Sequence, residues 1–230
     1  LYGRPDLALE AAQMKEVIRK QSWTGEWFRD NAIRRADGTL ELTDNCSETC
    51  QYYAFYFGTA TKELYPELYR RLIDEFGPDR AERGRYPQIH ASAPFIGNFL
   101  RVDWLGQLGM ARKVLEETRG YFLFMAQRTG TLWENVNSAD NGSCCHGFAS
   151  HVAVFLLRDI LGLKHIDRVA KTICFTPPED LPLDFCEATL PAGDEIVTLR
   201  WRRENGNVTT TTDLPDGWRS VPGAPVLHNE

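Results

Sequence analysis

Hydrophobic residues in this chain recur at helical spacing over roughly the first two thirds and at strand spacing over the last third. The helical part ends in GFASHVAVFLLRDILGL, an apolar run directly after His146 that we expect to form a helix. The other helices that the spacing predicts cover residues 7–21, 48–60, 63–76, 93–108 and 110–127.

The predicted helices are of two kinds. Residues 48–60 are apolar or aromatic nearly all round, which indicates a helix buried on every side, with its aromatic run filling the core. Residues 63–76 instead carry one apolar face beside charged positions, as a surface helix does, and the run after His146 is a second all-round apolar segment. A buried helix followed by a surface helix predicts helical hairpins arranged in two layers.

After Leu163 the period changes to two. Residues 195–203, EIVTLRWRR, alternate as a strand does, and Asn205-Gly206 joins them to NVTTTTDL in a predicted type I′ hairpin. We therefore expect two domains, a helical one over 1–165 and a small antiparallel β module over 166–230.

Composition narrows the set of partners. A formal charge of −6 without a dense Lys/Arg stripe argues against a nucleic-acid partner. No uninterrupted apolar run approaches the roughly 20 residues that span a bilayer, so no membrane partner is expected. The first residues do not resemble a secretory signal, and localisation stays open.

The six cysteines do not form a metal-site pattern. Cys46 and Cys50 are four residues apart, Cys144 and Cys145 are adjacent, and no CxxC pair occurs. We expect reduced, partly buried thiols, with a disulfide and a zinc site as the alternatives. The sequence calls for no metal and no cofactor.

A carboxylate lies beside an indole in the stretch TLWENVNSADNGSCCHGFAS, with His146 a few residues further on. This stretch resembles the α-L-rhamnosidases and their relatives among the six-hairpin glycosidases. Three other segments carry the same resemblance: FRDNAIRRADGTLELTDNCSETCQYYAF, PFIGNFLRVDWLGQLG and a tail ending in LPDGW. The order and spacing of these segments agree over most of the chain. One departure is Cys145 immediately before His146, where rhamnosidases usually have Asn.

The resemblance implies a fold and a size. The family has an (α/α)6 barrel followed by a β-sandwich, so the expectation is a mainly α, partial helical toroid followed by a small antiparallel β-sandwich module. Twelve helices and a sandwich need far more than 230 residues, so the resemblance implies that the chain is the C-terminal half of such an enzyme. The family's general acid belongs to a loop expected upstream, so we expect the isolated chain to be inactive.

The resemblance also implies site residues. Inverting glycosidases use one carboxylic acid and one carboxylate base, and Glu134 matches the family's base; a solvated or capping carboxylate is the alternative. Trp133 is expected to stack on a sugar ring, with core packing as the alternative. His146 is expected to donate to a sugar hydroxyl, or else to be satisfied by a backbone carbonyl.

Glu48 and Gln51 begin the other apolar helix, and in the ring geometry they would share the mouth that contains His146. Glu48 is expected to bind a hydroxyl or to act on Glu134 by like-charge repulsion; stabilising its own helix N-terminus is the alternative. We expect His151 to be a core histidine.

Three functions are compatible with these features. The leading expectation is a glycoside hydrolase fragment of α-L-rhamnosidase type, with a carbohydrate substrate and with either the missing N-terminal half of the barrel or a second copy as partner. The alternatives are a noncatalytic carbohydrate-binding or scaffolding toroid, and a helical toroid used for protein contacts.

Overall fold

The computed structural model describes residues 4–136 and 142–221, so residues 137–141 of the Trp-Glu stretch and the last nine residues of the expected β module lie outside it. The contacts divide the chain into two units. Unit 1 comprises residues 1–104 and 125–146, and unit 2 comprises residues 105–124 and 147–230. The chain passes from one unit to the other within α4, within α5 and after His146.

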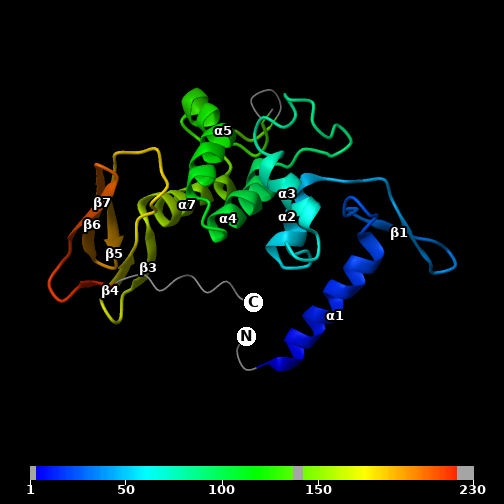
Figure 1. Ribbon diagram of the computed structural model, residues 1–230, viewed down its shortest axis with the longest axis horizontal. Coiled ribbons are helices and arrows are strands. Elements are labelled where there is room, and N and C mark those ends of the chain that lie inside the picture. The colour runs from blue at the N-terminus through cyan, green and yellow to red at the C-terminus, as the bar shows by residue number, and fades with distance from the viewer. Residues whose placement is uncertain (1–3, 137–141, 222–230) are drawn as a thin grey trace. The chain divides into compact units, whose positions relative to one another are not determined.

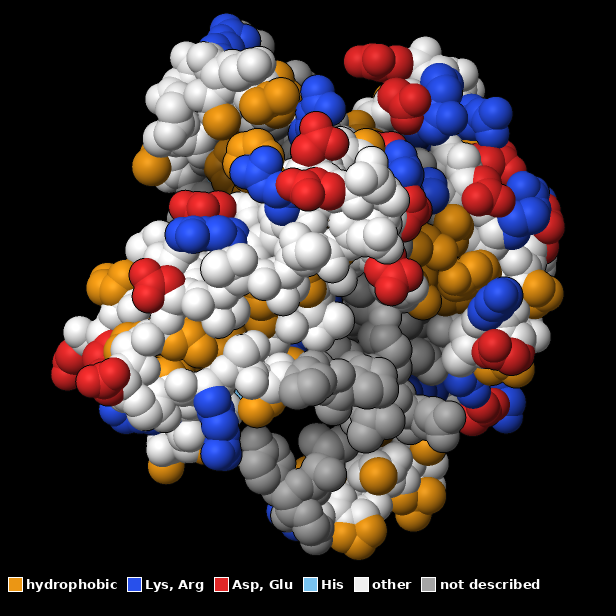
Figure 2. All heavy atoms as spheres, turned by 60° about the vertical axis from the view of Figure 1, so that its left-hand side comes forward, with side chains coloured by type: hydrophobic (Ala, Val, Ile, Leu, Met, Phe, Trp, Pro, Cys, Tyr) orange, Lys and Arg blue, Asp and Glu red, His pale blue; other side chains and the backbone are white. Residues whose placement is uncertain are grey.

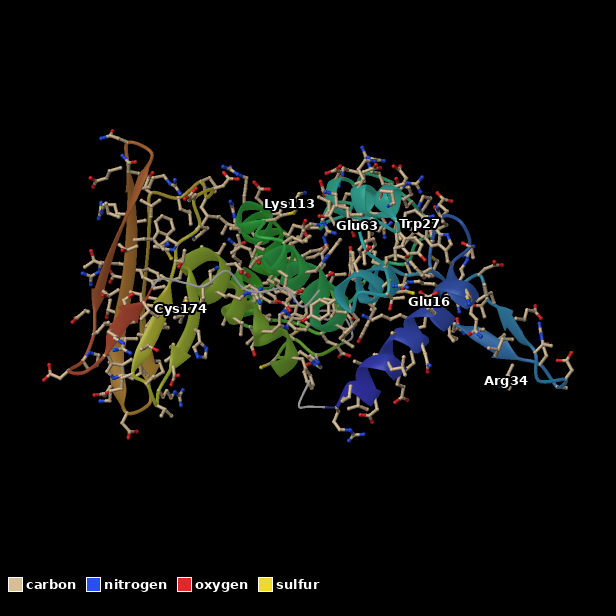
Figure 3. All side chains as sticks on the ribbon, turned by 60° about the horizontal axis from the view of Figure 1, so that its bottom comes forward. Glu16, Trp27, Arg34, Glu63, Lys113 and Cys174 are labelled. Carbon is tan, nitrogen blue, oxygen red and sulfur yellow. The ribbon has the colours of Figure 1, made fainter. Side chains whose placement is uncertain are left out.

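Unit 1 contains the helices of the N-terminal half and one small hairpin (Figure 1). The strands β1 and β2 pair antiparallel, and Arg34 stands at the outer part of this hairpin (Figure 3). The elements are α1 (Pro5–Ser22), β1 (Ala32–Arg34), β2 (Leu40–Leu42), α2 (Glu48–Tyr56), α3 (Pro66–Asp74), the π-helix η1 (Pro94–Asn98), the greater part of α4 (Phe99–Gln107) and the end of α5 (Ala111–Thr129).

Aromatic packing holds the centre of unit 1 together. The indole of Trp27 is buried, lies 5.1 Å from the ring of Tyr86, and has the guanidinium of Arg71 5.5 Å from its centroid (Figure 3). Phe55 packs in the same way, 5.1 Å from Trp104. These ring contacts join residues far apart in the sequence, so they fix α2, α3, α4 and the loop before α2 as one body.

Helix α1 is different, because none of its 18 residues is buried. Arg19 ties its C-terminal end to the unit by donating to the Thr59 carbonyl at 2.6 Å. Its apolar side chains Leu7, Met14 and Val17 are all exposed. An isolated helix of this length is only marginally stable in water, so this face is suited to a covering partner.

We predict that the purified chain self-associates through this α1 face. The change Met14→Glu places a charge in the middle of the face, so it should lower the apparent mass in light scattering while leaving the far-ultraviolet helix signal unchanged. Lys20→Glu, a charge change at an exposed position of the same helix, is the control and should leave the mass unchanged. A wild-type chain that stays monomeric over a wide concentration range would refute the prediction.

Unit 2 combines helical and β structure. Its strands form two three-stranded sheets, β3–β4–β8 and β5–β6–β7. Pairing is antiparallel except between β4 and β8, which are parallel. The elements are the body of α5, the 3-10 helix η2 (Gly147–His151), α7 (Val152–Phe155), the π-helix η3 (Leu156–Leu161), β3 (Leu163–Asp167), β4 (Thr172–Phe175), β5 (Phe185–Ala192), β6 (Glu195–Glu204), β7 (Asn207–Asp213) and β8 (Arg219–Val221).

The long hairpin of unit 2 confirms its sequence prediction. Asn205 and Gly206 both have positive φ, 51° and 83°, as a type I′ turn requires, and Glu204 pairs with Asn207. One face of β6 is buried through Val197, Leu199 and Trp201, while the intervening residues face outward. The alternation seen in the sequence therefore gives the sheet its core face.

The expectation of a mainly α helical toroid is wrong. Helices account for 39% of the structure and strands for 22%, with six α-helices and three small sheets in the described residues. The physical reason lies partly in the apolar run after His146, which forms three short helical pieces of different type instead of one buried helix. Phe148 in this run is 75% exposed. The expected division at residue 165 stays a prediction.

The helix over 48–60 is also shorter and less buried than expected. It ends at Tyr56, and its next turn closes through Gly58 at φ 67°. Tyr53 and Phe57 are exposed, so the aromatic run fills the core on one side only.

On the face shown in Figure 2, basic and acidic side chains are interspersed among apolar patches.

Candidate functional site

The loop around Glu134, which we define as residues 131–136 and 142–146, is held closed by backbone pairing. The Glu134 N–H donates to the Ser143 carbonyl at 3.0 Å, and the His146 N–H donates to the Leu132 carbonyl at 2.9 Å. These bonds bring Glu134 and His146 into one loop although they are twelve residues apart. Glu134 and His146 are both half-buried, and the Nε2 atom of His146 is itself buried.

Trp133 anchors this loop from inside. Its side chain is fully buried, and its Nε1 donates to the Thr129 hydroxyl at 2.8 Å. The backbone N–H of Trp133 lies 3.4 Å from the sulfur of Met125, and the Arg128 guanidinium is 5.6 Å from the indole centroid. This placement favours the packing alternative for Trp133; its expected role in sugar stacking stays a prediction.

A chain of hydroxyl groups extends the anchor across the loop. Thr129 and Thr131 share a hydrogen bond of 2.7 Å between their hydroxyl oxygens, and Thr131 donates to the Cys144 carbonyl. The indole, the two threonines and the backbone before His146 are thereby connected. The network keeps the Trp133 indole inside the unit, while the next residue, Glu134, stays half-buried.

Glu48 lies in another part of unit 1, buried at the start of α2. Its Oε1 pairs with Nε of the buried Arg80, and its Oε2 accepts from the backbone N–H and the hydroxyl of Ser92, both at 3.0 Å. Its own N–H donates to the His90 carbonyl at 2.9 Å. These bonds use Glu48 to fasten the segment between α3 and η1; its expected part in sugar binding stays a prediction.

Gln51 is fully buried and bonds to the backbone of Phe28. Its Oε1 accepts from the Phe28 N–H at 3.0 Å, and its Nε2 donates to the Phe28 carbonyl at 2.8 Å and to the Ser47 carbonyl at 3.1 Å. The side-chain amide of Gln51 therefore accepts from the N–H of Phe28 and donates to its carbonyl, as the backbone of a neighbouring strand would. Its expected contact with a sugar also stays a prediction.

Sequence reasoning missed Arg80, the buried partner of Glu48. Besides the ion pair, Arg80 donates to the carbonyls of Arg85, Tyr86 and Ile89 at 2.8 to 2.9 Å. Arg80 belongs to the charged stretch DRAERGR, which is typical of a protein surface, so the sequence gives no signal that this arginine is buried. The i, i+4 pair Tyr53 and Phe57 was also missed, because an aromatic run was interpreted as core throughout.

His151, which we expected to be a core histidine, lies in unit 2 at the end of η2. Its Nδ1 bonds to the Phe148 carbonyl, and its ring lies 5.3 Å from Phe155 and 5.9 Å from Phe122. The side chain is half-buried. These contacts are those of a packing residue.

The cysteines are free thiols, and burial makes two of them harder to ionise. All six cysteines are unbonded to one another. Burial raises the pKa of Cys46 to about 11 and that of Cys50 to about 12, and the nearby Asp30 carboxylate adds to both shifts. In the part of the chain that the structure describes, no group of three or more His, Cys, Asp or Glu side chains is arranged to hold a metal ion.

No protein-family profile matches the chain, and no curated protein matches it either. Among solved structures, the crystal structure of a GH78 family rhamnosidase of Bacillus sp. GL1 matches with a TM-score of 0.74 and 21% sequence identity. The fold is GH78-like. The match covers 96% of this chain and 23% of that rhamnosidase, so the chain spans about a quarter of its length.

The GH78-like fold agrees in part with the resemblance seen in the sequence. At 21% identity the match supports the fold alone. The match does not show a complete (α/α)6 barrel.

Over the described residues, no helix combines the length and the apolar character needed to cross a bilayer.

Proposed function

We propose that the chain is a segment of an inverting glycoside hydrolase of α-L-rhamnosidase type, in which Glu134 is the general base. The observation that carries the proposal is the clamped loop: a half-buried carboxylate next to a fully buried, hydrogen-bonded indole, with His146 at the other end of the same clamp. The GH78-like fold over nearly the whole chain supports it.

In this role Glu134 acts on water. Its carboxylate removes one proton as the water oxygen attacks the anomeric carbon, and the glycosidic C–O bond breaks on the opposite face. A second carboxylic acid gives its proton to the leaving oxygen, so that the products are the free sugar with inverted configuration and an alcohol. His146 is the proposed donor to a ring hydroxyl, and Trp133 keeps the loop in place.

No residue of this chain is assigned as the acid. We therefore propose that the acid is supplied by another segment of the barrel, and that the 230-residue chain alone hydrolyses no glycoside. Steady release of nitrophenol from an aryl α-L-rhamnoside by the purified chain, abolished in Glu134→Gln, would contradict this and would assign the whole reaction to the chain.

The proposal predicts that a positively charged sugar analogue binds through the negative charge of Glu134. An iminosugar with the configuration of L-rhamnose carries a protonated nitrogen near the position where positive charge develops in the transition state, and a carboxylate base attracts it. Glu134→Gln keeps the shape but removes the charge, so binding should weaken by roughly tenfold or more, as expected for loss of a charge-assisted hydrogen bond.

Isothermal titration calorimetry with the iminosugar measures this effect, with a D-gluco-configured iminosugar as the specificity control. Glu26→Gln is the matched variant, because Glu26 is an exposed glutamate of the same unit that pairs with Arg71. Equal affinity in wild type and Glu134→Gln would remove Glu134 from the site.

A noncatalytic carbohydrate-binding or scaffolding protein is the second candidate. It is favoured because no residue of this chain is assigned as the general acid that catalysis requires. The candidates differ in one measurement: this second function predicts binding of the neutral rhamnoside and of the iminosugar with similar affinity in wild type and Glu134→Gln.

A further inference from the structure

Unit 1 contains a hollow between α1 and α2 that shares no residue with the Glu134 loop. Its volume is about 440 Å³, which lies in the range of small-molecule sites. We call it the α1–α2 hollow. Its lining residues that matter here are Ile18, Asp30, Cys50, Tyr53, Ala54 and Phe57.

One wall of the hollow is an aromatic platform. The rings of Tyr53 and Phe57, one turn apart on α2, stack with centroids 5.4 Å apart and planes inclined by 20°. They are 44% and 54% exposed, although aromatic side chains of a helix are normally covered. The exposed parts of the two rings give this wall an apolar surface, which suits the C–H face of a ring-shaped ligand.

The other end of the hollow is polar. The Asp30 Oδ1 accepts from the backbone N–H of Ser47 at 2.9 Å and from its hydroxyl at 3.0 Å, which fixes the carboxylate at the start of α2. The Cys50 thiol, which also lines the hollow, has a side-chain hydrogen bond with the same carboxylate. A carboxylate offers about four acceptor positions, so Asp30 can also accept from the hydroxyls of a ligand.

We propose that the α1–α2 hollow binds a neutral pyranose ring, stacked on Tyr53 and Phe57 and hydrogen-bonded through its hydroxyls to Asp30. A sugar has both an apolar C–H face and a rim of donors, so it matches the two walls together. Arg29 also lines the hollow, so the lining carries one guanidinium and one carboxylate and suits a ligand without net charge. Asp30 is exposed, and a covering protein helix would take its carboxylate out of water, which is costly.

This site is additional to the proposed catalytic position. It uses Asp30, Tyr53 and Phe57, whereas the proposed function uses Glu134 and His146. A second pyranose site in a carbohydrate-active fold would hold a further residue of a substrate chain or a neighbouring glycan, and it would operate whether or not Glu134 is a base.

The test is a titration of the full chain with methyl α-L-rhamnopyranoside and, separately, methyl β-D-glucopyranoside, followed by saturation-transfer NMR and by backbone amide shifts. Tyr53→Ala removes one of the two rings of the platform and should weaken binding by roughly tenfold. Tyr53→Phe keeps the ring and should bind as wild type does. Asp30→Asn keeps an acceptor for Ser47 but loses the carboxylate, and should weaken binding several-fold.

Controls separate this site from the Glu134 loop. Leu64→Ala removes an exposed apolar side chain elsewhere in unit 1 and should leave sugar binding unchanged. Glu134→Gln should leave the amide shifts around the α1–α2 hollow unchanged. If Glu134→Gln abolishes sugar binding while Tyr53→Ala and Asp30→Asn do not, the hollow is not a sugar site and the proposed function stands.

Two other results would overturn the inference. One is no saturation transfer from the wild-type chain to either methyl glycoside at tens of millimolar sugar. The other is binding that Tyr53→Ala leaves intact while the same change lowers the mass seen in light scattering, because the hollow would then be a protein contact.

Discussion

Arg80→Ala should destabilise unit 1 by about 3–5 kcal/mol, the typical cost of breaking a buried ion pair from one side. Arg80 and Glu48 are both almost completely buried, and each makes further hydrogen bonds besides the pair. Removing the guanidinium leaves the Glu48 carboxylate buried, with Ser92 as its remaining side-chain partner among the described residues, and it also releases three carbonyl groups of residues 85–89.

Urea unfolding followed by tryptophan fluorescence measures this cost. Arg83→Ala is the matched control, because Arg83 belongs to the same segment but pairs with Asp79 at the surface; its effect should stay within about 0.5 kcal/mol. The double change Glu48→Met with Arg80→Met should recover part of the loss, since two apolar side chains leave no buried charge. Equal effects of Arg80→Ala and Arg83→Ala would show that the pair contributes nothing.

The ion pair illustrates what the sequence could not supply. Glu48 was visible as the first residue of a helix, but its partner lies 32 residues away in a stretch of charged residues that reads as solvent-exposed. A long-range polar contact leaves no periodic signal. The Asn205-Gly206 turn shows the opposite case, because a type I′ turn is set by its own two residues and the prediction was confirmed.

Helix burial was the other source of error. The segment after His146 is apolar all round, yet it forms short helical pieces with Phe148 exposed, and Gly162 at φ 99° ends them. Composition alone reports how apolar a segment is and not which neighbours are present to cover it. The same holds for Tyr53 and Phe57, where a run interpreted as core contains an exposed stacked pair.

The proposed site was predictable in part. The spacing of Trp133, Glu134 and His146 marked one loop, and the structure joins its two ends by backbone hydrogen bonds. The sequence left open whether the indole faces a ligand or the core, because tryptophan serves both. Burial of the indole and its bond to Thr129 now favour the core.

Trp133→Ala should therefore act as a core substitution, with a loss of about 3–5 kcal/mol. The cavity would be bounded by Met125, and the hydroxyl of Thr129 would lose its donor. Trp133→Phe fills much of the space but cannot donate, so it should cost less, with about 1 kcal/mol from the hydrogen bond. Val136→Ala, at an exposed position of the same loop, is the control and should have little effect.

Hydrogen exchange distinguishes an anchor from a ligand platform. If Trp133 holds the loop, the amides of Glu134 and His146, which donate to Ser143 and Leu132, should exchange faster in Trp133→Ala without any sugar present. The iminosugar affinity of Trp133→Phe should then stay close to that of wild type, because the loop keeps its shape. Unchanged exchange in Trp133→Ala together with lost sugar binding would instead make the indole a direct contact, and the clamp would not depend on it.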